Sequence, residues 1–231
     1  MQYLFTPPVV VSVPVVGKTE QFPVHRIYCV GRNYEEHAKE MGFTGREPPF
    51  FFLKPADALV FAPSGQTVNM PYPSLTKNFH HEIELVLKIS KEGKYIQPQF
   101  AHRYFEEIGL GIDFTARDLQ DQCKAKGLPW EIAKAFNGSA PIGEFKSVAE
   151  LGDLNNIDFQ LEINGELRQK GNTSLMLFDF ATIISYVSQF FTLKKGDLIY
   201  TGTPAGVGPV QKGDQLVGFI GNEKMLHVEV K

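Results

Sequence analysis

Three carboxylates in two strand-like segments constrain the fold of this chain more than any other feature. Glu82 and Glu84 lie in one apolar segment, and Asp113 lies in the glycine-containing run 109–114. Residues two apart in a strand share a face, with α-carbons roughly 6.7 Å apart. Because burying an unpaired carboxylate costs several kcal/mol, a strand-rich core that holds all three needs a cation, a basic partner or protonation. A hard divalent metal is the simplest cation.

Alternation along the strand offers a plainer explanation for the two glutamates. If the intervening Ile and Leu side chains face the core, Glu82 and Glu84 lie on a solvated face. Asp113 does not fit that explanation, because no polar alternation surrounds it. The metal interpretation therefore rests on the three acids together.

Short β-branched or aromatic runs bounded by Gly, Pro or Asn predict that strands dominate the chain. We expect strands over 26–30, 50–53, 82–89, 110–114, 159–163, 198–200, 215–220 and 226–230. Helices are fewer, over 34–41, 116–126 and 178–190. Asn164-Gly165 predicts a type I′ hairpin, since both central residues of that turn need positive φ. The pattern indicates a β-rich α+β protein.

Length and charge narrow the class further. We expect 231 residues to form one domain, 1–231, with residues 1–24 as a strand region packed on it. The net charge of −3, without a basic run, favours a small-molecule partner over nucleic acid or a membrane surface. Cys29 and Cys123 have no metal-type spacing and predict free thiols. No apolar run reaches about 20 residues, so we expect a cytoplasmic protein.

Several polar residues outside the acid trio could carry chemistry. His37 and Glu40 share one helix face and could form a general base, or could be a solvated pair. Lys54, Lys134 and Arg117 could each extend to water or act near a substrate carboxylate. Asn33 could be a helix N-cap, and the turn at 201–204 could bring Thr203 toward a ligand.

A series of motifs runs in order from residue 30 to the carboxyl terminus. They are Val30-Gly-Arg-Asn-Tyr34 with His37 and Glu40, Phe52-Leu-Lys-Pro55, His80-His-Glu-Ile-Glu-Leu85, Asp113-Phe-Thr-Ala-Arg-Asp118, Gly127-Leu-Pro-Trp130 with Lys134, Asn164-Gly-Glu166 and Thr201-Gly-Thr-Pro204. This ordered set resembles the fumarylacetoacetate hydrolase family, in particular its short acylpyruvase and oxaloacetate decarboxylase members.

The resemblance implies a mixed β-sandwich roll with a few short helices, usually assembled as a homodimer. It implies Mg²⁺ or Mn²⁺ held by Glu82, Glu84 and Asp113. It also implies catalytic roles for His37, Glu40 and Lys134. The candidates for substrate binding are Arg32, Asn33, Lys54, Arg117 and Thr203.

Three functions follow as hypotheses. The first is a hydrolase that cleaves the C–C bond of acylpyruvates, such as acetylpyruvate or fumarylpyruvate, through a metal-stabilised pyruvate enolate. The second is an oxaloacetate decarboxylase or keto–enol tautomerase that uses the same site. The third is a non-catalytic β domain that binds a metal or ligand.

Overall fold

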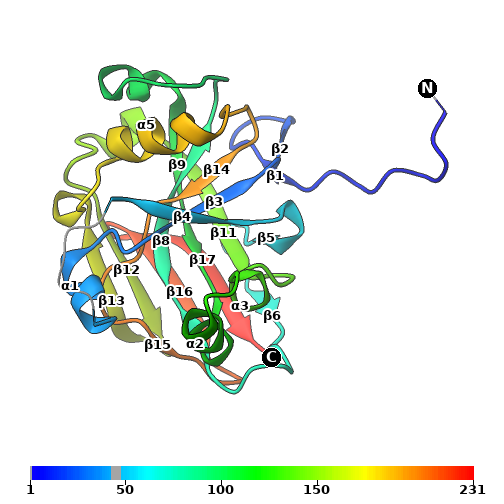
Figure 1. Ribbon diagram of the computed structural model, residues 1–231, viewed down its shortest axis with the longest axis vertical. Helices are drawn as coiled ribbons and strands as arrows, with labels where there is room; N and C mark the ends of the chain where they lie inside the picture. The colour runs from blue at the N-terminus through cyan, green and yellow to red at the C-terminus, as the bar shows by residue number, and fades with distance from the viewer. Residues whose placement is uncertain (1, 43–47) are drawn as a thin grey trace.

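Strands outnumber helices in the computed structural model, which describes residues 2–42 and 48–231 (Figure 1). Within these ranges the largest sheet has seven strands, most of them antiparallel to their neighbours. Their order is β4 (Phe50–Lys54), β3 (Ile27–Gly31), β14 (Leu198–Tyr200), β8 (Ile83–Ile89), β9 (Phe105–Ile112), β11 (Ala140–Ser147) and β5 (Leu59–Phe61). The predicted β-rich fold is confirmed.

A second sheet packs against the first. In the described part of the chain it has five strands, in the order β13 (Glu166–Asn172), β12 (Asp158–Ile163), β16 (Gln215–Ile220), β17 (Glu223–Val230) and β6 (Val68–Met70). Smaller pairings join β7 (Phe79–His81) to β10 (Thr115–Ala116) and β15 (Gly208–Pro209), and β1 (Ser12–Pro14) to β2 (Gln21–Pro23).

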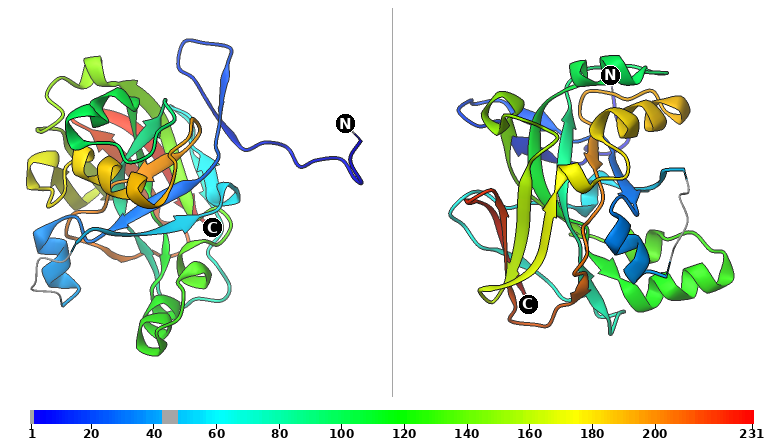
Figure 2. Two further views of the ribbon diagram at one scale, coloured as in Figure 1. Left: turned by 45° about the horizontal axis from the view of Figure 1, so that its top comes forward. Right: turned by 90° about the vertical axis from the view of Figure 1, so that its left-hand side faces the viewer.

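The helices are short and lie around the sheets. They are α1 (Glu35–Glu40), α2 (Arg117–Lys126), α3 (Glu131–Lys134), α4 (Val148–Leu151) and α5 (Phe180–Phe190), with 3₁₀ turns η1 (Ala56–Ala58), η2 (Pro98–Arg103) and η3 (Thr173–Leu175). The right-hand view of Figure 2 shows α1 and α2 near each other, at the end of the molecule that holds the candidate site. No helix within the described ranges has the length and apolar character of a membrane span.

Strand β8 is buried on both faces, so the solvated-face explanation for Glu84 is wrong. Leu85 and Leu87 belong to the main core, which also contains side chains of the five-stranded sheet. Val86 points to the opposite face and belongs to a second apolar cluster with Tyr200. Because residues two apart in a strand share a face, the side chain of Glu84 lies on the same face of β8 as Val86. This is the face that packs against the second cluster.

The two sheets lie very close together where β11 meets β17, at Gly143. A Cβ on Gly143 would overlap the carbonyl oxygen of Met225. We expect Gly143→Ala to lower the free energy of unfolding by about 1–3 kcal/mol through overpacking, measured by urea denaturation. Gly208→Ala is the control, because its Cβ would meet only His81 Nε2 at 3.7 Å. Equal stability of the two variants would contradict this account.

The sequence located eight strands and three helices of the described structure, but not all of their ends. Asn164 and Gly165 have φ of 54° and 81° and join β12 to β13, which confirms the predicted hairpin. Strand β11 was missed, because Pro141 and Gly143 interrupt its strand pattern. Glu82 and Asp113 lie just outside β8 and β9 rather than within them. Glu82 therefore lies in the break between β7 and β8, although its carboxylate still converges with that of Glu84.

The predicted N-terminal strand region is divided in the structure. Residues 12–14 and 21–23 form the β1–β2 hairpin, with Val13 buried in the second apolar cluster. Residues 2–10 are exposed, Leu4 almost completely, and extend away from the domain (Figure 1). The two cysteines, Cys29 and Cys123, are buried free thiols.

Candidate metal and substrate site

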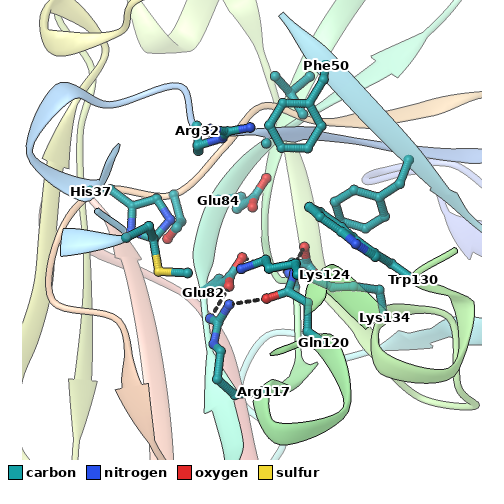
Figure 3. Close-up of a pocket in the computed structure, with 16 residues that line it drawn as sticks. Arg32, His37, Phe50, Glu82, Glu84, Arg117, Gln120, Lys124, Trp130 and Lys134 are labelled. Atoms are coloured by element: carbon teal, nitrogen blue, oxygen red, sulfur yellow. Dashed lines mark hydrogen bonds and ion pairs between the residues drawn. The ribbon is translucent and has the colours of Figure 1, made fainter. Parts of the chain in front are cut away.

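A pocket opens between α1, α2 and the ends of β3, β4 and β8 (Figure 3). Acidic, basic and aromatic side chains from segments far apart in the sequence line it. They are Arg32, His37, Met41, Phe50, Phe52, Glu82, Glu84, Asp113, Arg117, Gln120, Lys124, Trp130, Lys134 and Thr203, together with Val30 and Gly31.

The three predicted acids meet at the bottom of this pocket. Glu84 projects from β8, Glu82 precedes that strand, and Asp113 directly follows β9, the antiparallel neighbour of β8. One carboxylate oxygen from each lies within 4.8 Å of the others, and all three residues are buried. The register of β8 on β9 brings them together, because Ile83 pairs with Ile112.

Buried cations compensate two of these acids. Lys134 Nζ lies 2.9 Å from Glu82 Oε2 and 2.7 Å from Asp113 Oδ2, and Arg117 pairs with the other oxygen of Glu82. Burial alone would raise the pKa of Glu82, but Lys134 and Arg117 hold it well below its usual value. Burial likewise opposes the charge of Lys134, yet Asp113 and Glu82 raise its pKa, so this lysine stays protonated.

Glu84 is the acid that the protein leaves uncompensated. Its Oε2 accepts a hydrogen bond from the Gly202 N–H at 2.7 Å, and no ion pair reaches it within the described residues. Burial and the nearby charges of Asp113 and Glu82 raise the pKa of Glu84 well above its usual value.

The oxygen set fits a hard divalent cation. Lys54 Nζ lies 2.8 Å from Asp113 Oδ1, but off the direction of a hydrogen bond, so that buried oxygen keeps a free lone pair. A cation beside Glu84 and Asp113 Oδ1 would compensate the charge that the protein leaves unpaired. Three carboxylates with no nitrogen or sulfur donor are typical ligands of Mg²⁺ or Mn²⁺.

His37 is buried at the pocket wall on the helix α1. Its Nδ1 lies 3.5 Å from Glu40 Oε2 and has no hydrogen-bond partner in the described part of the chain. Burial lowers the pKa of His37 and outweighs the opposing effects of Glu82 and Glu40. The imidazole is therefore neutral near pH 7 and able to accept a proton. The buried position excludes the alternative of a solvated pair for His37, whereas Glu40 is partly exposed.

The glycine-rich turn after β14 connects α1 to the acids. Gly206 N–H donates to Glu40 at 3.0 Å, while Gly202 N–H donates to Glu84. Thr203 lines the pocket, and its hydroxyl donates to the carbonyl of Ile83 at 2.8 Å. The predicted approach of this turn to the site is therefore present in the structure.

Two predicted substrate-binding residues lie outside the pocket lining. Asn33 is fully buried and its side chain bonds to the backbone of Phe178 and Thr201. It is not the N-cap of α1, a position that Tyr34 takes. Lys54 lies behind Asp113, where it also donates to Ser139. These internal bonds hold both side chains away from the pocket lining.

The sequence missed an aromatic wall and one helix face. Trp130 packs against Phe50 and Phe52, each with ring centroids 5.7 Å away. Arg32, with φ of 54°, places its guanidinium 4.6 Å from the Phe50 centroid. Gln120 and Lys124 of α2 also line the pocket. Gln120 and Lys124 follow Arg117 by three and seven residues, a spacing that places all three side chains on one face of a helix. This spacing could have identified them from the sequence.

Comparisons with known proteins find relatives that cover most of this chain. The family described as "Fumarylacetoacetate (FAA) hydrolase C-terminal" matches residues 26–226. The mouse (Mus musculus) protein "Oxaloacetate tautomerase FAHD1, mitochondrial" is 45% identical over 205 residues, covering 89% of this chain and 91% of that protein. "Oxaloacetate decarboxylase, mitochondrial" of Dictyostelium discoideum is 43% identical over 188 residues, with 81% and 85% covered.

A solved structure matches almost the full length of the chain. It is fumarylpyruvate hydrolase from Pseudomonas aeruginosa in complex with Mn²⁺ and pyruvate, with a TM-score of 0.95 and 45% identity. The match covers 99% of each chain. The similarity therefore extends to the fold as a whole, including the segment before β1.

Proposed function

Because this chain belongs to the fumarylacetoacetate hydrolase family, we propose that it is a divalent-metal-dependent hydrolase that cleaves the C–C bond of acylpyruvates. Water adds to the distal carbonyl, the bond between that carbon and C3 breaks, and the products are a carboxylate, pyruvate and one proton. The observation that carries this proposal is the buried neutral His37 at the wall of a pocket whose floor is the acid trio.

Glu82, Glu84 and Asp113 would hold Mg²⁺ or Mn²⁺. Their converging oxygens and the uncompensated charge of Glu84 support this assignment, as does the Mn²⁺ in the Pseudomonas structure. When bound, the cation would polarise the carboxylate and 2-oxo groups of a 2-oxo acid and accept electron density during C–C cleavage.

His37 would take a proton from the attacking water. Its Nδ1 faces Glu40 Oε2 at 3.5 Å, so a proton held at Nδ1 would leave Nε2 to accept one. Glu40 would position this ring, since its carboxylate is itself fixed by the Gly206 N–H. Such proton transfer contributes typically 10²–10⁴-fold to a rate.

Lys134, Arg117 and Arg32 of the pocket would bind the negative ends of the substrate. Lys134 stays protonated, so it would act as a hydrogen-bond donor to developing negative charge rather than as a base. Arg117, Arg32 and Thr203 line the same pocket and would orient the substrate carboxylate. Asn33 and Lys54 would support the site from behind.

The names of two relatives favour a second candidate, oxaloacetate tautomerisation or decarboxylation. Either reaction needs the cation and enolate stabilisation, but neither needs an attacking water. The same acids and Lys134 would serve them. A non-catalytic binding domain, the third hypothesis, has no use for a buried neutral histidine beside the acid trio.

A substrate panel tests the proposed function. We expect acetylpyruvate or fumarylpyruvate to be hydrolysed with Mg²⁺ or Mn²⁺. A chelator should lower turnover roughly 100-fold or more, because removing the metal costs more than losing a residue that only supports the metal ligands. Pyruvate release, coupled to lactate dehydrogenase, measures hydrolysis and decarboxylation, and the loss of enol absorbance measures tautomerisation of oxaloacetate. Turnover of oxaloacetate alone would establish the second candidate, and turnover unaffected by chelator would contradict both.

The homodimer and the cytoplasmic location stay predictions. The mouse and Dictyostelium relatives are named mitochondrial, so cell fractionation is the direct measurement of location. Sedimentation analysis would measure the assembly.

A further inference from the structure

Lys124 is a pocket residue for which the proposed reaction has no role. It lies on α2, seven residues after Arg117 and four after Gln120, so the three side chains share one face of that helix. All three line the pocket (Figure 3). Arg117 and Gln120 bond to each other at 2.6 Å, and Arg117 also pairs with Glu82. Lys124 has no comparable strong bond to any residue in the ranges 2–42 and 48–231.

The side chain of Lys124 turns over the aromatic wall instead of extending into water. Its Nζ lies 5.6 Å from the centroid of the Trp130 ring, and its side chain is only 30% exposed. Lysines near a surface normally direct the ammonium group to water. This partial burial and the nearby charge of Arg117 lower the pKa of Lys124.

Within the described ranges, Lys124 also takes no part in the ion pairs that neutralise buried acids of the site. Lys54, Lys134 and Arg117 already pair with Glu82 and Asp113 at the bottom of the pocket. The ion pair of Lys124 is with Asp121, at 4.0 Å, and that carboxylate is 63% exposed. Such a long, exposed pair contributes little. Lys124 is therefore a cation that can bind a further anion.

We propose that Lys124, held over Trp130, forms a subsite for the second carboxylate of a dicarboxylic 2-oxo acid. This inference rests on the proposed function, because the first carboxylate and the 2-oxo group of the same ligand would lie at the acid trio. A neutral acyl group gains nothing from an ammonium group at this position. A carboxylate gains a charge-assisted hydrogen bond, which corresponds to about 10- to 100-fold in affinity.

The test compares two substrates in the Lys124→Met variant, which keeps an unbranched side chain over Trp130. We expect kcat/KM for fumarylpyruvate to fall about 10- to 100-fold, mainly through KM, while kcat/KM for acetylpyruvate stays nearly unchanged. Lys124→Arg should retain the preference. Lys126→Met is the matched control, because Lys126 is exposed in the last turn of the same helix. Equal losses for both substrates would overturn the proposal.

A binding measurement separates this proposal from the proposed function. Calorimetry with Mn²⁺ compares 2-oxoglutarate with 2-oxopentanoate, and 2-oxoadipate with 2-oxohexanoate, so that each pair differs only in the second carboxylate. We expect the wild type to bind at least one dicarboxylic acid more tightly and Lys124→Met to lose that difference. If no acylpyruvate is turned over, the proposed reaction fails but this result still supports the subsite. No preference in the wild type, or a preference kept by Lys124→Met, would overturn it.

Discussion

Glu84→Gln should abolish Mn²⁺ binding at the proposed site and lower metal-dependent turnover roughly 100-fold or more. Glu84 is the acid with the least compensation from the protein, so it depends most on a cation. Gln keeps the shape of the side chain and an oxygen for the Gly202 N–H, but it cannot supply the negative charge. Isothermal titration with Mn²⁺ and the pyruvate-release assay measure the two effects.

We also expect Glu84→Gln to change how the stability of the protein depends on pH. The folded-state pKa of Glu84 is raised, so the stability linked to its protonation is fully present below the unfolded pKa and is lost as pH rises through the folded pKa. Gln resembles the protonated acid, so Glu84→Gln should not lose this stability as the pH rises. We expect metal-free Glu84→Gln to melt at pH 7 no lower than metal-free wild type.

Adding Mn²⁺ should then raise the melting temperature of the wild type but not of Glu84→Gln, since a ligand stabilises only the state that binds it. Glu106→Gln is the control, because Glu106 is exposed on β9. A Glu84→Gln protein that bound Mn²⁺ as well as the wild type would remove the metal assignment from every function considered.

His37→Ala should lower acylpyruvate hydrolysis about 10²–10⁴-fold, the usual contribution of a positioned general base. Decarboxylation of oxaloacetate should survive in part, because it requires no attacking water. Both reactions are measured on the same preparation with Mg²⁺, and the chemistry at the acid trio serves as the internal control. Equal loss of the two activities would contradict the division of roles between His37 and the acids.

The pH profile distinguishes a base from a structural residue. The lowered pKa of His37 keeps the ring neutral, so hydrolysis by the wild type should persist below the ordinary histidine pKa of about 6.5 and decline only at more acidic pH. Glu40→Gln removes a charge that raises the pKa of His37. The acid limb of its profile should therefore move to lower pH. A limb that did not move would show that Glu40 does not act on His37.

Much of the fold could be predicted from local sequence patterns. Period-two and period-3.6 hydrophobicity indicated eight of the seventeen strands in the described ranges, together with α1, α2 and α5. Asn164-Gly165 indicated a turn that only residues tolerant of positive φ can form. Element ends were less accurate, because hydrogen bonds from neighbouring strands decide them. Strand β11 was missed for that reason, since its pairing with β9 and β5 overrides the effect of Pro141 and Gly143.

The sequence by itself determined which chemistry the chain can hold. Three acids in apolar segments, a His/Glu pair at helical spacing and a series of ordered motifs were sufficient to indicate the family and the kind of site. These are properties of residue type and short spacing, and neighbouring residues in the chain encode them directly.

Only the tertiary structure decided what each side chain faces. Lys54 and Asn33 share motifs with site residues, yet long-range bonds to Ser139 and Phe178 hold them behind the pocket. Lys124 is outside the quoted motifs, yet α2 places it over Trp130 and into the pocket. Whether a polar side chain meets substrate depends on partners more than 80 residues away in some cases. No local pattern records such partners, because packing between sheets and helices selects them.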